Sequence, residues 1–287
     1  MKGILMAGGS GSRLWPLTSG ISKQLLPVFD KPLIYYPLST LMSTGIREFF
    51  IISTPEDLPI IKNLLGNGSR FGISIDYCIQ EKPLGIAQGI TLAQDFISDD
   101  NFALILGDNI FYGQELELQL KNVGSIVGSK VFAYRVSDPS RYGVVELDQN
   151  SKPRSIEEKP RNPKSDLALT GLYFFDSKAV TIARGLLPSN RGELEITDVL
   201  LQYMKQDELH VITMPAGTAW LDAGTPTSLH DASTFVRIIE ERQGIKIACP
   251  EIIAYKHGWI SKEKIQEIIF TAPKSPYSEY LKKATTT

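Results

Sequence analysis

The sequence contains few of the residues from which disulfide frameworks and zinc sites are built. Its 287 residues include two cysteines, Cys78 and Cys249, and three histidines, His210, His230 and His257. Two cysteines so far apart in the chain form neither a disulfide framework nor a metal-ligand cluster. We therefore expect both to be free, buried thiols, which suits a reducing compartment.

The sequence also lacks an excess of charge and any long hydrophobic run. Lys and Arg total 30 and Asp and Glu total 32, so the formal net charge is −2. This balance gives no support for nucleic-acid or anionic-membrane partners. No apolar run approaches the roughly 20 residues that a membrane span needs, and the N-terminus has no leader of signal-peptide length. We expect a cytoplasmic protein with no nucleic-acid and no membrane partner.

Strand and helix patterns alternate through the first half of the chain. This alternation is typical of an α/β fold with a mostly parallel, Rossmann-like central sheet flanked by helices. Ligands of such sheets lie beyond the carboxyl ends of the strands. Apolar runs and amphipathic patterns predict strands at 3–7, 48–53, 73–79 and 102–106 and helices at 33–44, 59–65 and 86–96.

A glycine-rich loop follows the first predicted strand and is the first candidate for a functional site. Free N–H groups in such a turn form a concavity that suits phosphate oxygens, and Arg13 and Lys23 add two cations. A P-loop would end in Gly-Lys-Ser/Thr, and a dinucleotide fingerprint would need a glycine where Leu14 stands. On these residues alone, a phosphate site and a plain turn with solvated cations both remain open. The loop glycines are Gly8, Gly9 and Gly11.

The longer strings around this loop resemble a known family. Residues 5–18, LMAGGSGSRLWPLT, resemble the signature loop of the sugar-nucleotide pyrophosphorylases, which are nucleotidyltransferases. Residues 22–38, SKQLLPVFDKPLIYYPL, are similar to the glucose-1-phosphate thymidylyltransferase branch of that family rather than to its uridylyl branch. Similar motifs continue to about Gly244, so the resemblance covers most of the chain.

The resemblance implies a nucleoside triphosphate bound across the glycine loop. Arg13 and Lys23 would contact its phosphates, Gln24 and Gln80 its base, and Gly85 the base or ribose. A glutamine amide suits a pyrimidine edge because it offers both a donor and an acceptor. Without the resemblance, Gln80 is better interpreted as a surface residue.

Two aspartates match the family's magnesium positions. Asp108 follows the apolar strand at 102–106, so its carboxylate should project into the crevice at the strand ends. From the residues alone it could equally cap the next helix. The resemblance implies that Asp108 and Asp222 hold Mg²⁺, the expected cofactor, and two carboxylates plus substrate phosphates are the usual magnesium arrangement.

The second half of the chain is predicted to be richer in strands, at 131–136, 143–147, 155–158 and 168–175. By themselves Glu158 and Lys159 are best interpreted as a solvated charge pair. The resemblance instead implies that Glu158 binds sugar hydroxyls and Lys159 the sugar phosphate. It implies further sugar contacts at Asn109, Gly143, Leu169, Thr170 and Trp220.

The expected organisation is a catalytic domain at 1–244 and a helical segment at 245–287 that contacts another subunit. Within the domain, about 1–125 would bind the nucleotide and about 126–230 the sugar. The resemblance implies a homotetramer. It also allows feedback binding of a dTDP-deoxysugar, because Tyr112 fits the family pattern.

The implied reaction is transfer of a thymidylyl group from dTTP to α-D-glucose 1-phosphate, a first step toward deoxysugars such as dTDP-rhamnose. No Ser or Cys nucleophile stands beside a His base in the motifs, so the sequence gives no indication of a covalent enzyme intermediate. Catalysis would then rest on Arg13, Lys23, Asp108 and Lys159. Two alternatives remain: the same chemistry with UTP or an amino-sugar phosphate, or a non-catalytic regulator that binds sugar nucleotides.

Overall fold

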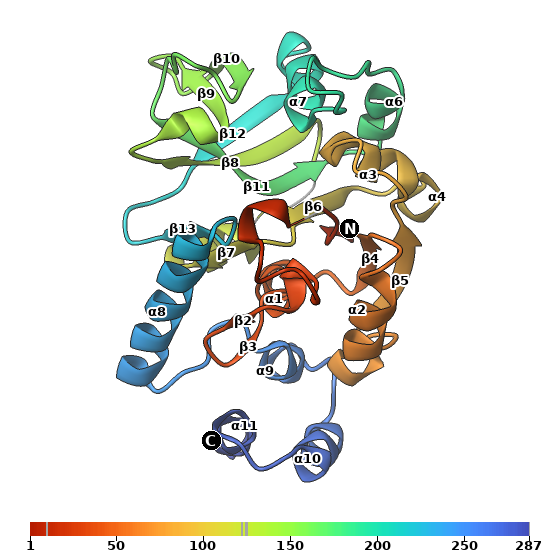
Figure 1. The fold of residues 1–287 in the computed structure, drawn as a ribbon, viewed down its shortest axis with the longest axis vertical. Coiled ribbons are helices and arrows are strands. Elements are labelled where there is room, and N and C mark those ends of the chain that lie inside the picture. The colour runs from red at the N-terminus through yellow and green to blue at the C-terminus, as the bar shows by residue number, and fades with distance from the viewer. Residues whose placement is uncertain (10, 122, 124–125, 287) are drawn as a thin grey trace.

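A nine-stranded mixed sheet forms the centre of the protein in the computed structural model (Figure 1). The structure describes residues 1–9, 11–121, 123 and 126–286, so Ser10 of the expected glycine loop lies outside the described residues. The strands are β1 (Lys2–Met6), β4 (Glu48–Ser53), β5 (Ser74–Ile79), β6 (Phe102–Leu106), β8 (Ser129–Arg135), β9 (Gly143–Leu147), β10 (Pro153–Glu158), β11 (Leu167–Phe175) and β12 (Leu209–Thr213).

Four neighbouring strands, in the order β6-β1-β4-β5, are parallel. Leu5 of β1 lies opposite Ile51 of β4 and Ile105 of β6. Their apolar runs follow from burial on both faces of the sheet. The four strands predicted for the first half are confirmed, with ends shifted by no more than one residue.

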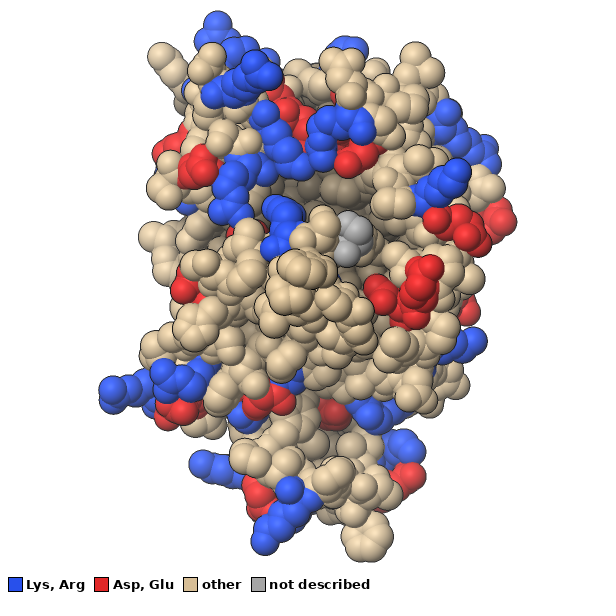
Figure 2. All heavy atoms as spheres, viewed as in Figure 1, with Lys and Arg blue, Asp and Glu red and all other residues tan. Residues whose placement is uncertain are grey.

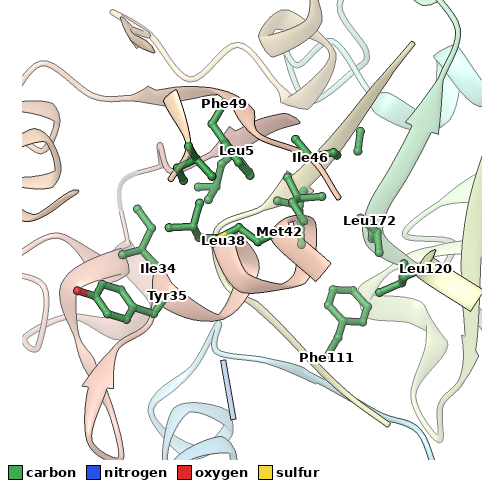
Figure 3. Packing of buried hydrophobic residues seen from close by; sticks show 14 of the residues in the cluster. Leu5, Ile34, Tyr35, Leu38, Met42, Ile46, Phe49, Phe111, Leu120 and Leu172 are labelled. Atoms are coloured by element: carbon green, nitrogen blue, oxygen red, sulfur yellow. The ribbon is translucent and has the colours of Figure 1, made fainter. Parts of the chain in front are cut away.

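Helices cover both faces of these parallel strands. Successive residues of β1 point to opposite sides of the sheet, so each face has its own apolar cluster under a helix. Leu5 packs with Leu38 of α1 and with Phe49 in one apolar cluster (Figure 3). Ile4 packs with Ile90 of α3 in a second cluster on the other face. The fold therefore has a helix layer, the sheet and a second helix layer, as the alternating sequence pattern predicts.

Eleven helices lie within the described residues, and most of the predicted ones are confirmed. The predicted helix 86–96 is instead two helices, because Ala93 leaves helical backbone angles at φ −91° and ψ 8°. The helices are α1 (Tyr35–Ser43), α2 (Leu58–Leu65), α3 (Ile86–Leu92), α4 (Gln94–Ile97), α5 (Gln114–Lys121), α6 (Lys178–Arg184), α7 (Ile196–Lys205), α8 (Pro226–Gln243), α9 (Pro250–Lys256), α10 (Lys262–Thr271) and α11 (Pro276–Ala284).

Strand β11 joins the parallel strands to an antiparallel region. It pairs antiparallel with β6, β8 and β9, and all nine of its residues are buried. The antiparallel pair β9–β10 extends this side of the sheet, and β12 adds a parallel edge to β8. One sheet therefore runs through both the expected nucleotide part and the expected sugar part of the chain.

The helices after Gly244 pack onto the same core as the parallel strands. Ile252, Ile265 and Leu281 belong to the apolar cluster that contains Leu38, and α10 and α11 lie at the end of the molecule away from β9 and β10 (Figure 1). The division at residue 244 stays a prediction. None of the described helices is long and apolar enough to cross a membrane, and a cytoplasmic location also stays a prediction.

Candidate active site

A cavity of about 310 Å³ opens at the carboxyl ends of β1 and β6. Such strand ends are where α/β sheets bind ligands. The predicted phosphate, base and metal residues of the first half meet here. The cavity is lined by Gly8, Gly9, Gly11, Arg13, Lys23, Gln24, Gln80, Gly85 and Asp108, among others. We call this group the nucleotide side.

The glycine loop needs its glycines for space and for backbone angle. A Cβ on Gly8 would lie 2.9 Å from Gln80 Oε1, and one on Gly11 would lie 2.9 Å from the Thr18 side chain. Gly9 and Gly11 also have φ values of 109° and 58°, which favour glycine. The loop then turns through a short 3₁₀ helix, Ser12–Leu14, that aims Arg13 at the cavity.

The side-chain amides of Gln24 and Gln80, which are predicted to contact the base, are buried and hydrogen-bonded. Gln24 is 2% exposed and Gln80 is 5% exposed. Gln80 Nε2 donates to Gln88 Oε1 at 2.7 Å, and the Ser22 hydroxyl donates to Gln24 Oε1 at 3.2 Å. The fixed amides therefore present defined donor and acceptor atoms to a ligand.

Gly85 packs closely against a second loop. It has φ 108°, and a Cβ there would lie 2.6 Å from the backbone nitrogen of Leu194. Backbone bonds from Leu194 N to Leu84 O and from Ala87 N to Leu194 O join the two segments. Residues 192–195 form this second loop, and α7 begins after them at Ile196. The loop also brings Glu193, which the sequence did not single out, to the cavity wall.

The two predicted metal ligands lie at one end of a short two-stranded sheet, Asp222 as its last paired residue and Asp108 as the residue before its first. Strands β7 (Asn109–Tyr112) and β13 (Ala219–Asp222) pair antiparallel, with Asp222 opposite Asn109. The backbone N–H of Ala223 donates to the carbonyl of Asp108 at 2.9 Å. This small sheet, missed from the sequence, brings together two aspartates that are far apart in the chain.

Each carboxylate has its own set of partners. Asp108 forms an ion pair with Lys23, and its Oδ1 accepts a bond from Asn109 Nδ2 at 2.8 Å. Asp222 Oδ1 accepts from the Tyr142 hydroxyl at 3.1 Å. Burial is the main cause that raises the pKa of Tyr142 to about 12, so this tyrosine remains a donor at neutral pH.

The described residues contain no cluster of three or more His, Cys, Asp or Glu side chains that could hold a metal. A magnesium ion here would therefore depend on two carboxylates and on substrate oxygens. Asp108 and Asp222 meet that requirement as a pair of hard oxygen donors, so the donor set fits magnesium.

The predicted sugar contacts gather around Trp220 and β9–β11, and none of them lines the 310 Å³ cavity. A Cβ on Gly143 would lie 3.3 Å from Glu158 Oε2. Trp220 Nε1 donates to Asn109 Oδ1 at 2.5 Å, which links this region to Asp108. The set comprises Asn109, Gly143, Glu158, Lys159, Leu169, Thr170 and Trp220, and we call it the sugar side.

Glu158 is the centre of a small group of ion pairs on the sugar side. Glu158 lies 3.7 Å from Lys159 Nζ and 3.5 Å from the Arg191 guanidinium. Burial raises the pKa of Glu158, although the charge of Lys159 acts to lower it. The sequence did not single out Arg191, because its loop has no periodic pattern. Figure 2 shows basic side chains around a hollow with acidic groups inside it, on the face between the upper strands and the N-terminal loop.

Leu169 and Thr170 lie within β11, and both side chains are buried. The Thr170 hydroxyl has no hydrogen-bond partner within the described residues. Their contribution to a sugar site would therefore come from the main chain.

The chain is similar to known proteins along almost its whole length. Residues 2–238 match the family model described as nucleotidyl transferase. The chain is 53% identical to a glucose-1-phosphate thymidylyltransferase of Neisseria meningitidis, with 98% of each chain covered. It is 51% identical to one of Mycobacterium tuberculosis, again with 98% of each covered.

Solved structures agree with this relationship. A Bacillus anthracis protein in complex with sucrose, provisionally named a glucose-1-phosphate thymidylyltransferase, matches with a TM-score of 0.76 at 43% identity, covering 83% of this chain and 95% of that one. A UDP-glucose pyrophosphorylase in complex with UDP-glucose has a TM-score of 0.72 at 22% identity, covering 83% and 98%, which is a likeness of fold alone. The fold class predicted from the sequence is confirmed.

Proposed function

The chain belongs to the nucleotidyl transferase family, and we propose that it transfers the thymidylyl group of dTTP to glucose 1-phosphate, giving dTDP-glucose and pyrophosphate. Its most similar named relatives given above are glucose-1-phosphate thymidylyltransferases at 51–53% identity. The observation that carries the proposal is the junction of the two sides of the site. Asn109 bonds both to Asp108 on the nucleotide side and to Trp220 on the sugar side.

The reaction needs placement and neutralisation of charge more than it needs proton transfer. An oxygen of the sugar 1-phosphate is already an anionic nucleophile. It forms a bond to the α-phosphorus of dTTP, and the bond from that phosphorus to the bridging oxygen breaks, so the electron pair leaves with pyrophosphate. In-line placement and electrostatic stabilisation account for most catalysis in phosphoryl transfer.

Arg13, Lys23 and Lys159 would supply the protein's positive charge. Arg13 and Lys23 line the cavity and would hold the triphosphate. Lys159 would hold the sugar phosphate from the other side. Fixed cations aimed at the reacting phosphates stabilise the charge that develops in the transition state.

Asp108 and Asp222 would hold Mg²⁺ between them and the substrate phosphates. A bound magnesium ion polarises phosphoryl oxygens and offsets their negative charge. The ion pair with Lys23 holds the Asp108 carboxylate at the wall of the cavity, where the cation would bind.

The test is a turnover assay that combines dTTP or UTP with glucose 1-phosphate or an amino-sugar 1-phosphate. Pyrophosphate and the nucleotide sugar are detected as products, and nucleotide binding is measured in parallel. Thymine differs from uracil by one methyl group, which gives about 1–3 kcal/mol of discrimination. We expect efficient turnover with dTTP and weaker but measurable turnover with UTP. Preference for UTP, or for an amino-sugar phosphate, would replace the proposed substrates, and binding without turnover would favour a regulator.

The proposal extends to a homotetramer with possible feedback by a dTDP-deoxysugar. The C-terminal helices expose an aromatic side chain, Phe270, which is 91% exposed. Tyr112 and Lys246 line a second cavity of about 400 Å³, separate from the nucleotide side. Light scattering that gives a monomer at micromolar concentration would rule out the tetramer. Unchanged rates with added dTDP-rhamnose would rule out feedback by that nucleotide.

A further inference from the structure

Tyr142 lies where the two sides of the site meet, and it was not among the predicted site residues. Its hydroxyl donates to Asp222 Oδ1 at 3.1 Å. Its ring packs against Trp220 with centroids 5.1 Å apart. Its backbone carbonyl accepts a bond from the Lys159 N–H at 3.0 Å. One residue thus touches a predicted metal ligand, a wall of the sugar side and the backbone of a predicted phosphate-binding lysine.

Without Tyr142, Asp222 would have weaker side-chain contacts than Asp108 has. Asp108 is fixed by Lys23 and by Asn109 at 2.8 Å. Asp222 is the last residue of β13, and its other side-chain partner within the described residues is Arg141 at 3.4 Å. The Arg141 side chain is 41% exposed, so this contact is a loose one. The Tyr142 hydroxyl therefore gives the shorter of the two side-chain bonds to Asp222.

We propose that Tyr142 is a positioning residue whose hydroxyl fixes the orientation of Asp222 toward the divalent cation. The ring of Tyr142, packed on Trp220, keeps that hydroxyl in place. The inference rests on the proposed function, in which Asp222 is a metal ligand. Hydrogen-bond partners that orient a ligating group commonly change metal affinity by about 10–100-fold when they are removed.

The experiment uses Tyr142→Phe, which keeps the ring on Trp220 and removes only the hydroxyl. Tyr134→Phe is the matched control, because Tyr134 also packs on Trp220, at 5.9 Å, but donates its hydroxyl to the carbonyl of Thr218. Mn²⁺ binding to the full-length protein is measured by electron paramagnetic resonance in the presence of dTDP-glucose. The Mg²⁺ dependence of turnover is measured in parallel, with Asp222→Asn as the reference for loss of a ligand.

We expect Tyr142→Phe to weaken Mn²⁺ binding by about tenfold and Tyr134→Phe to leave it unchanged. Added Mg²⁺ should restore most of the turnover of Tyr142→Phe, while the KM for glucose 1-phosphate stays near the wild-type value. Wild-type Mn²⁺ affinity in Tyr142→Phe, beside a clear loss in Asp222→Asn, would overturn this inference and leave the proposed function standing. Wild-type affinity in Asp222→Asn would overturn both this inference and the metal assignment on which it rests.

Discussion

The predicted base contacts on the nucleotide side are buried amides beside main-chain groups, whereas the charged side chains on and beside the sugar side are half-exposed. Gln24 and Gln80 are almost fully buried, and the glycine loop offers main-chain N–H groups. Lys159 and Arg191 have side chains that are 45% and 40% exposed. The difference indicates that the base-binding part of the nucleotide side is formed before binding, while Lys159 and Arg191 become fixed on binding.

The half-exposed charged side chains lose conformational freedom when a ligand binds, and the buried amides do not. Ordering a long lysine or arginine side chain costs up to about 2 kcal/mol, whereas a buried glutamine has already lost that freedom. We therefore expect substitutions on the nucleotide side to affect affinity for the base directly. Substitutions on the sugar side should affect the KM for glucose 1-phosphate and its salt dependence.

The largest effect should come from the carboxylates where the two sides meet. Asp108→Asn or Asp222→Asn should reduce kcat by about 10³-fold or more, because charge stabilisation by a bound metal amounts to several kcal/mol. Thermal unfolding should show that both variants stay folded. Asp207→Asn, a surface aspartate that pairs with Lys152, is the matched control and should keep wild-type rates. A near-normal Mg²⁺-dependent rate in either variant would contradict the assignment.

The next effect should separate the sugar side from the nucleotide side. Lys159→Gln should raise the KM for glucose 1-phosphate by about 10–100-fold, since a hydrogen bond to a charged group contributes about 1.5–3 kcal/mol. The KM for dTTP should change little. Lys164→Gln is the control, because Lys164 is an exposed cation on the next loop that pairs with Glu157 at 2.5 Å. An equal loss for both substrates would remove the distinction between the two sides.

A smaller effect is expected for the buried amides. Gln80→Ala should lower kcat/KM for dTTP and for UTP alike, by about 1–3 kcal/mol, because base groups would be left unpaired. The affinity for glucose 1-phosphate should stay the same. Gln88→Ala, which removes the partner of Gln80 Nε2, should give a weaker loss of the same kind. A loss with only one nucleotide would show that Gln80 does not contact the edge that both pyrimidines share.

The smallest effect concerns stability. Burial raises the pKa of Glu158 above its unfolded value, so the folded protein binds this proton more tightly than the unfolded chain does. Its contribution favours folding at low pH and is lost as the pH rises through the folded pKa. Glu158→Gln should therefore raise Tm by about 1–2 °C at pH 7, and the difference should shrink near pH 4. A lower Tm for the variant at pH 7 would contradict this.

The sequence was most informative where local pattern and tertiary structure agree. The apolar runs at 48–53 and 102–106 predicted strands, and the parallel sheet with its ligand-binding edge followed from that prediction. The nine predicted residues of the nucleotide side lie on one cavity, although their contacts with a ligand stay a prediction. Their positions depend on strand ends and on glycine backbone angles, both of which leave a clear mark in a sequence.

The features that the sequence did not predict depend on contacts between distant segments, and those segments carry no recognisable local sequence pattern. Strands β7 and β13 are four residues each and pair across more than a hundred positions. Arg191 and Tyr142 reach the site from a loop and from the end of a short turn, where no periodic pattern exists. Ala93 breaks a helix whose amphipathic pattern continues through it. Such features follow from packing, and a single sequence gives no means of choosing among the possible packings.

The exchange of labelled pyrophosphate into dTTP is the most direct test of direct transfer from dTTP to glucose 1-phosphate. If dTTP and glucose 1-phosphate meet in one site and react in a single displacement, exchange requires the sugar phosphate or dTDP-glucose. We predict no exchange with the enzyme, Mg²⁺, dTTP and pyrophosphate alone, and rapid exchange once glucose 1-phosphate is added. Exchange without any sugar phosphate would demonstrate a covalent thymidylyl-enzyme and would contradict direct transfer between the two sides of the site.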